Sequence, residues 1–126
     1  MNTVIVIFAS IAILFHALAF VLESLLFMRP QVYRRFQSQN AEQAQAARLF
    51  AFNQGFYNLF LAASTVVGIV LAAGNDVGRD WALVAVCCTF MVGAALVLIV
   101  SERRMIRAAA IQGTAPLAAL LLMAIG

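Results

Sequence analysis

The sequence predicts an all-α fold, a four-helix transmembrane bundle with antiparallel up-down topology, in a single domain that covers residues 1–126. Composition gives the first reason. Hydrophobic residues make up 65% of the chain and charged residues 10%, with a mean hydropathy of +1.00, which lies well outside the soluble range. The second reason is that four apolar runs reach the roughly 18 residues that a helix needs to cross a bilayer.

The four predicted spans are joined mostly by short connections. They cover residues 3–27, 41–73, 81–100 and 105–125. The first span has no basic segment before it and is too long for a signal peptide, so we expect it to stay in the membrane as the first helix. The second span begins after a capping box, Asn40 followed by Gln43, and its first two turns are expected to extend into the cytosol.

The longest connection, residues 28–40, interleaves aromatic residues with arginines. That pattern is typical of a loop lying at the membrane interface, and we expect its rings to face lipid and its guanidinium groups to face phosphates. Residues 74–80 have the composition of a turn, and residues 101–104 predict a tight cytosolic turn.

Small residues occur four apart on two of the predicted helices. Such pairs allow two helix backbones to approach closely in a membrane. The pairs are Gly68 with Ala72, and Ala109 with Gly113. They predict tight helix packing around these positions.

Arginines set the predicted orientation. Seven of the eight basic residues lie on the side where the first and third spans end, and only Arg79 lies on the other side. The positive-inside rule then places the arginine-rich side in the cytoplasm and both termini outside. Membrane lipids are the expected partners. Nucleic acid is not expected, because no basic helix or loop stands clear of the membrane.

Polar side chains gather on three of the predicted helices. An amide or a carboxyl group in hydrocarbon loses its water and must find a partner, so it is rare there without a role. The second helix carries several such groups within an arc of about 140°, and the first and fourth helices carry others. The candidate ligand-binding residues are His16, Glu23, Asn53, Gln54, Tyr57, Asn58 and Gln112.

Three of these residues share one depth. At a rise of 1.5 Å per residue, Glu23, Asn53 and Gln112 each lie about 6–9 Å inside the cytosolic boundary. Asn58 lies deeper, and His16 lies near the midplane. We therefore expect these five side chains, with Tyr57 beside them, to converge on one pocket in the cytosolic half of the bundle.

A structural interpretation stands beside the functional one. Amides often hold membrane helices together, and His16 can donate to a neighbouring carbonyl. A carboxylate in hydrocarbon is costly unless it is paired or protonated, which makes a merely structural Glu23 harder to accept. Its partner can be His16, an amide of the second helix, or an arginine reaching in from the interface.

The sequence predicts no metal and no cofactor. Cys87 and Cys88 are adjacent, so on a helix they point about 100° apart and lack the spacing of metal ligands. The chain has one histidine, without a second ligand at a metal-binding spacing. No phosphate-binding loop or nucleophile elbow is present.

The pattern of His16 and Glu23, followed by residues 53–63 and then by Gln112 before a proline, resembles the DUF1304 family of small bacterial integral membrane proteins. The resemblance spans nearly the whole chain. It departs at Phe15, where the family commonly has Glu, and at Pro116, which is shifted by one position. It implies a four-helix fold in the bacterial inner membrane, without an established activity, although some members carry an epimerase label.

Two classes of function follow. The first is binding or transport of a small or lipid-like ligand in a polar pocket open to the cytosolic side, where Glu23 and His16 change protonation. Four helices are few for alternating access, so transport would need a homodimer. The alternative is a membrane-embedded enzyme, isomerase-like or epimerase-like, with Glu23 or His16 as the acid/base. A structural accessory role is the third option.

Overall fold

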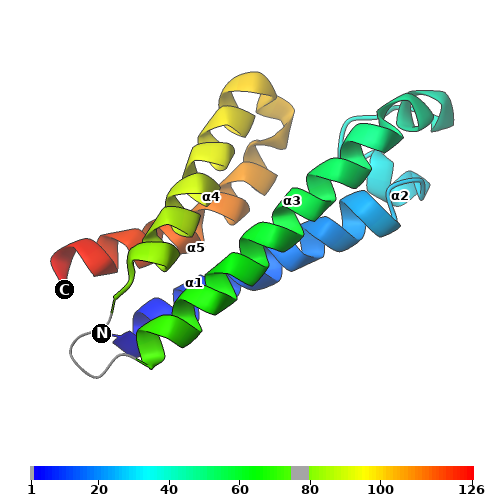
Figure 1. Cartoon of the computed structure of the whole chain (residues 1–126). Coiled ribbons are helices and arrows are strands. Elements are labelled where there is room, and N and C mark those ends of the chain that lie inside the picture. The colour runs from blue at the N-terminus through cyan, green and yellow to red at the C-terminus, as the bar shows by residue number, and fades with distance from the viewer. Residues whose placement is uncertain (1, 75–79) are drawn as a thin grey trace. The chain divides into compact units, whose positions relative to one another are not determined.

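The computed structural model describes residues 2–74 and 80–126, and in this part of the chain every regular element is a helix. The fold class predicted from the sequence, an all-α membrane protein, is thereby confirmed. In order, the elements are α1 (Asn2–Phe20), η1 (Val21–Leu25), α2 (Pro30–Tyr33), α3 (Ala41–Ala73), α4 (Ala82–Ser101), η2 (Arg103–Met105) and α5 (Ile106–Ile125) (Figure 1). Most of the predicted turn at residues 74–80 lies outside the described residues.

Among the described residues, four helical stretches are long and apolar enough to cross a membrane. They are Asn2–Leu25, Ala41–Ala73, Ala82–Ser101 and Arg103–Ile125. Each begins and ends within about two residues of its predicted span, which is the usual uncertainty of a helix boundary. The helices thus begin and end close to where the sequence predicts them. The antiparallel order of the spans stays a prediction.

The chain divides into two compact units, residues 1–15 with 61–126 and residues 16–60, which we describe separately. In the first unit, α4 and α5 pack side by side and are joined through η2 (Figure 1). Its core has two clusters. The buried members of the first are Ala9, Val84, Cys88 and Ala119, and those of the second are Ala12, Met91 and Ala115.

Small residues allow the close packing of the first unit. A Cβ atom added to Gly68 would lie 2.8 Å from Cγ2 of Val84, and one added to Gly113 would lie 3.0 Å from Cβ of Ala95. Buried beside them are the other members of the two predicted pairs, Ala72 and Ala109. The prediction that these pairs bring helices close together is confirmed.

The second unit begins with the end of α1 and the π-helical turn η1. Here the backbone N–H of Leu26 donates to the carbonyl of Val21 at 3.0 Å, a five-residue spacing that widens the turn. The apolar pattern predicted a continuous helix to residue 27 and gave no sign of the π turn. The helix instead ends at Leu25, since Leu26 leaves helical geometry with φ −114° and ψ 8°.

The connection between η1 and α3 folds into the short helix α2, and its aromatic rings turn inward. Tyr33 is only 5% exposed, and the Phe27 and Phe36 ring centroids lie 5.9 Å apart. The expectation that the rings of this segment face lipid is therefore wrong for Tyr33. They pack instead against an alanine-lined face of α3 formed by Ala44, Ala47 and Ala51, whose small side chains leave room for the rings.

The segment after α2 closes with a left-handed residue. Gln37 has a φ of 69°, and the N–H of Ser38 donates to the carbonyl of Tyr33 at 3.1 Å. The N–H of Gln37 donates to the carbonyl of Arg34, also at 3.1 Å. These two bonds form the Schellman pattern that ends a helix, in which the left-handed position usually belongs to glycine.

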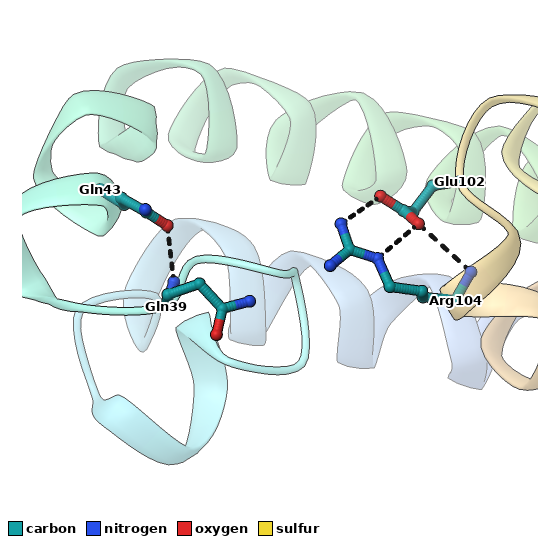
Figure 2. Close-up of polar contacts among 4 residues, drawn as sticks. All are labelled: Gln39, Gln43, Glu102 and Arg104. Atoms are coloured by element: carbon teal, nitrogen blue, oxygen red, sulfur yellow. Dashed lines mark hydrogen bonds and ion pairs between the residues drawn. The ribbon is translucent and has the colours of Figure 1, made fainter.

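Asn40 caps the start of α3, as predicted. The backbone N–H of Gln43 donates to Oδ1 of Asn40 at 2.9 Å, which satisfies a donor of the first turn that lacks a helical partner. The return bond differs from that of a capping box, because Oε1 of Gln43 accepts the backbone N–H of Gln39 at 2.8 Å and not that of Asn40 (Figure 2). The helix α3 accordingly begins at Ala41.

In the first unit, an exposed ion pair shapes the turn between α4 and α5. The guanidinium of Arg104 donates to Glu102 through Nε at 2.9 Å and through Nη2 at 2.8 Å (Figure 2). Hydrogen bonds from the side chain and the backbone of Arg104 lower the pKa of Glu102 from 4.5 to about 2. The predicted tight turn is thus stabilised by the ion pair between Glu102 and Arg104.

Candidate functional site

The candidate site lies in the second unit, where the carboxyl group of Glu23 on η1 meets the amide of Asn58 on α3. Nδ2 of Asn58 donates to Oε1 of Glu23 at 3.1 Å and to the backbone carbonyl of Gln54 at 3.2 Å. Both side chains are half-buried, and both lie inside apolar spans. The structure therefore brings together two of the residues that the sequence singled out.

The second contact fixes which way the amide of Asn58 points. A backbone carbonyl only accepts hydrogen bonds, so the group facing Gln54 must be the NH₂ and not the oxygen. Both N–H bonds of Asn58 are then in use, and Asn58 is a donor to Glu23 whether or not the carboxyl carries a proton. Among the described residues, Oε1 of Glu23 is the oxygen engaged by Asn58, which leaves Oε2 for a further partner.

Close packing of η1 against α3 positions this pair. The hydroxyl of Ser24 donates to the backbone carbonyl of Phe52 at 2.7 Å. A Cβ atom on Gly55 would lie 1.9 Å from Oγ of Ser24 and 3.0 Å from its backbone nitrogen. Only glycine allows this approach at position 55. The contact holds η1 on α3 one residue away from Glu23.

Aromatic rings add a second contact between α1 and α3 in this unit. Phe20 meets Phe56 edge to face, with ring centroids 5.1 Å apart. Phe56 also contacts Phe52 at 5.1 Å and Phe60 at 6.1 Å. Phe52 and Phe60 are themselves exposed, so the contact between the two helices is made by Phe20 and Phe56.

The other predicted residues of α3 face outward. Asn53 is exposed and donates to the carbonyl of Leu49 on its own helix at 3.0 Å. Gln54 is exposed as well, and Tyr57 is 70% exposed. Their side chains lie within two turns of Asn58 along α3. That they bind the same ligand as Glu23 stays a prediction.

The two remaining predicted residues lie on other elements. His16, on α1, is 1% exposed. It precedes Glu23 by seven residues, which corresponds to about 10 Å along the helix axis. Gln112 lies on α5, in the first unit, and is half-buried. Convergence of His16 and Gln112 with the Glu23–Asn58 pair therefore stays a prediction.

Sequence reasoning missed three features of this site, namely Ser24, Gly55 and the π turn. One signal was available, because a glycine and a serine on two neighbouring apolar helices are the small residues that let backbones approach. The π turn leaves no comparable signal in the apolar pattern of residues 21–25.

The described residues contain no group of three or more His, Cys, Asp or Glu side chains arranged to hold a metal ion. Cys87 and Cys88 are buried, free thiols on α4. Cys88 belongs to the first core cluster, where it packs as a small hydrophobic residue.

The four apolar helices define a helical protein of the multi-pass membrane class. Within that class, residues 10–124 match the model of the DUF1304 family, described as a protein of unknown function, and the chain belongs to this family. The resemblance seen in the sequence is thereby confirmed over nearly the whole chain. No curated protein and no solved structure matches the chain.

Proposed function

We propose that the protein binds or transports a small or lipid-like ligand at a polar site within the membrane, centred on Glu23 and Asn58. The hydrogen bond of 3.1 Å between these two side chains supports the proposal best, because it joins a carboxyl group and an amide on two apolar segments. A charged or strongly polar group is expensive at this depth. We therefore infer that Glu23 has a functional role.

Glu23 is not needed to pack η1 against α3. The hydroxyl of Ser24 already bonds to α3 at 2.7 Å, and Gly55 already lets the two segments touch. These contacts lie next to the carboxyl group and hold η1 on α3 without a titratable side chain. Glu23 therefore adds chemistry to a contact that other residues secure.

The chemistry that Glu23 adds is a change in hydrogen bonding with its proton. Without a proton, the carboxylate accepts hydrogen bonds at both oxygens; with one, Oε2 becomes a donor while Oε1 still accepts from Asn58. A ligand that offers a hydrogen-bond donor to Oε2 favours the unprotonated form of Glu23, and a ligand that offers an acceptor favours the protonated form. Ligand entry and proton transfer to Glu23 are then linked.

Outward-facing residues of α3 extend the site. Tyr57 directly precedes Asn58, and Gln54 lies one turn before it. Both are exposed, so their phenol and amide groups can bond to a ligand that enters beside Asn58. With the orientation that the arginines predict, this entrance faces the cytosol. Transport in this form requires a homodimer, since four helices are few for alternating access.

The alternative is a membrane-embedded enzyme of the isomerase or epimerase type, with Glu23 or His16 as the acid/base. An acid and a base that act on one carbon must both lie within hydrogen-bond reach of it. The separation of about 10 Å along the axis between positions 16 and 23 makes that difficult on one helix. One of the two residues would then have to serve alone, whereas binding at Glu23 and Asn58 needs no second titratable group.

Native mass spectrometry of the full chain, extracted from membranes into a mild detergent, tests the proposal. The wild-type protein is expected to retain a co-purifying small molecule or lipid, and Glu23→Gln is expected to lose it while keeping the fold. The amide of Gln can still accept from Asn58, so the variant changes charge and proton rather than shape.

Glu102→Gln is the matched control, since it removes an acid from the exposed turn instead. Equal retention by wild type and Glu23→Gln would refute the proposal. If the melting temperature of Glu23→Gln also rose, Glu23 would be a structural residue whose burial merely costs stability.

A further inference from the structure

A second polar feature of α3 lies nearer its N-terminus and is independent of Glu23. Four side chains line a shallow depression on the surface of this helix: Gln45, Arg48, Leu49 and Phe52. Their spacing of three, four and seven residues places them on one face. The polar pair comes first along the helix and the apolar pair follows, so the depression changes from polar to apolar toward the membrane span.

Arg48 has no acidic partner in the part of the chain that the structure describes, where the ion pair present joins Arg104 to Glu102. The nearest acid on the same helix, Glu42, lies six residues earlier, which is about 9 Å along the axis and about 120° around it. The second unit carries four arginines and two glutamates. The positive charge of Arg48 is therefore not neutralised by a carboxylate within the second unit.

Arg48 lies where α3 leaves the hydrocarbon. With 33 residues, α3 is about 50 Å long, whereas the hydrocarbon core is about 30 Å thick and takes about 20 residues, so one end of α3 extends beyond it. The depth expected for Asn53, about 6–9 Å inside the cytosolic boundary, puts that boundary within about one residue of Arg48. The long side chain of Arg48 can then reach the headgroup phosphates.

Phe52 and Leu49 lie on the apolar side of this level. Leu49 is 67% exposed and Phe52 is 46% exposed, so the methyl groups of Leu49 and the ring of Phe52 are accessible to an acyl chain. We propose that these four residues form a binding site for an anionic phospholipid, with its phosphate on Arg48 and Gln45 and an acyl chain along Leu49 and Phe52. Guanidinium groups bind phosphate oxygens through paired, charge-assisted hydrogen bonds.

Titration of the full chain in detergent with phosphatidylglycerol or phosphatidylcholine, followed by native mass spectrometry, tests the site. Arg48→Gln is expected to raise the apparent Kd for phosphatidylglycerol about tenfold, because a charge-assisted phosphate contact is lost. Its Kd for phosphatidylcholine should change little. Arg107→Gln is the matched control, since Arg107 is exposed in the first turn of α5 and its loss removes the same charge.

The apolar half has its own test. Leu49→Ala is expected to weaken binding of both lipids, whereas Leu96→Ala, at an equally accessible leucine of α4, is expected to leave it unchanged. Equal losses in Arg48→Gln and Arg107→Gln would mean a diffuse charge effect and would overturn the proposal. Displacement of phosphatidylglycerol by millimolar inorganic phosphate would overturn it too, because the site would then bind free anions.

Discussion

Replacing Gly55 with alanine should separate η1 from α3 and disturb the Glu23–Asn58 pair. The new Cβ would lie 1.9 Å from Oγ of Ser24 and 3.0 Å from both the Cβ and the backbone nitrogen of Ser24. The hydroxyl can rotate away, at the loss of its bond to Phe52. The backbone nitrogen cannot, so one segment must move by several tenths of an ångström.

The structure allows the magnitude to be worked out. Alanine favours the helix over glycine by about 0.8–1 kcal/mol, which partly offsets the damage. The lost hydrogen bond of Ser24 costs about 0.6 kcal/mol on average for a membrane helix pair. Overpacking of a tight contact costs about 1–3 kcal/mol. These contributions sum to an expected net loss of about 0.6–2.8 kcal/mol of unfolding free energy.

Gly93→Ala provides the control. A Cβ added to Gly93, on α4, meets no atom within 4 Å, so this variant should gain stability from helix propensity alone. Reversible unfolding of the full chain in mixed micelles would compare the two variants with the wild type. The changes in unfolding free energy of the two variants should have opposite signs. If Gly55→Ala were as stable as Gly93→Ala, the close approach at Ser24 would not be what holds η1 on α3.

The remaining predictions concern the connections and the orientation. Gln37→Gly should stabilise the chain by about 1 kcal/mol. Gln37 has a left-handed φ of 69°, a conformation that costs residues other than glycine about 1 kcal/mol in free energy. A loss of stability in the same unfolding assay would contradict this. Glu102 has a lowered pKa, so the contribution of its ion pair should be full above 4.5 and lost as the pH falls through about 2; an NMR titration of the Arg104 Nε–H with its midpoint at 4.5 would argue against it. On a chain without Cys87 and Cys88, an external thiol probe should reach a cysteine at the C-terminus and not one at position 103; the reverse pattern would invert the topology.

The spans, the fold class and the start of α3 could be predicted because they depend on local sequence. An apolar run of sufficient length forms a helix in lipid whatever its neighbours are, since backbone groups have no other partner there. The cap by Asn40 is equally local, as Asn40 and Gln43 lie three residues apart. Such features need no knowledge of which helix packs on which.

The inward turn of Tyr33 could not be predicted in the same way. Arginines and aromatic rings interleave in residues 28–40 whether the rings meet lipid or protein. The alternative depends on a distant segment of α3, where Ala44, Ala47 and Ala51 leave a face smooth enough to receive rings. The composition of residues 28–40 shows that aromatic rings are present but does not show which surface they pack against.

The two asparagines of α3 show where side-chain prediction stops. Asn53 and Asn58 share chemistry and lie on the same helix, yet Asn53 bonds to its own helix and Asn58 bonds across to Glu23. The reason is rotational. Asn58 lies on the face of Gly55 and Ala51, three and seven residues before it, whereas Asn53 is about 200° from Ala51. The buried small residues mark the contact face, and the polar residues alone do not.

Neighbouring residues allow Glu23 to gain or lose a proton without separating the two helices. Ser24 and Gly55 hold η1 against α3 through contacts that do not depend on pH. Asn58 donates to Glu23 in both protonation states, so gain or loss of the proton need not break that bond. The proton therefore alters mainly what Oε2 offers to a partner, and the helices stay together. In the function proposed above, a change in the protonation of Glu23 therefore alters ligand binding and not the fold. Glu23→Gln, which keeps the shape of the side chain, tests this.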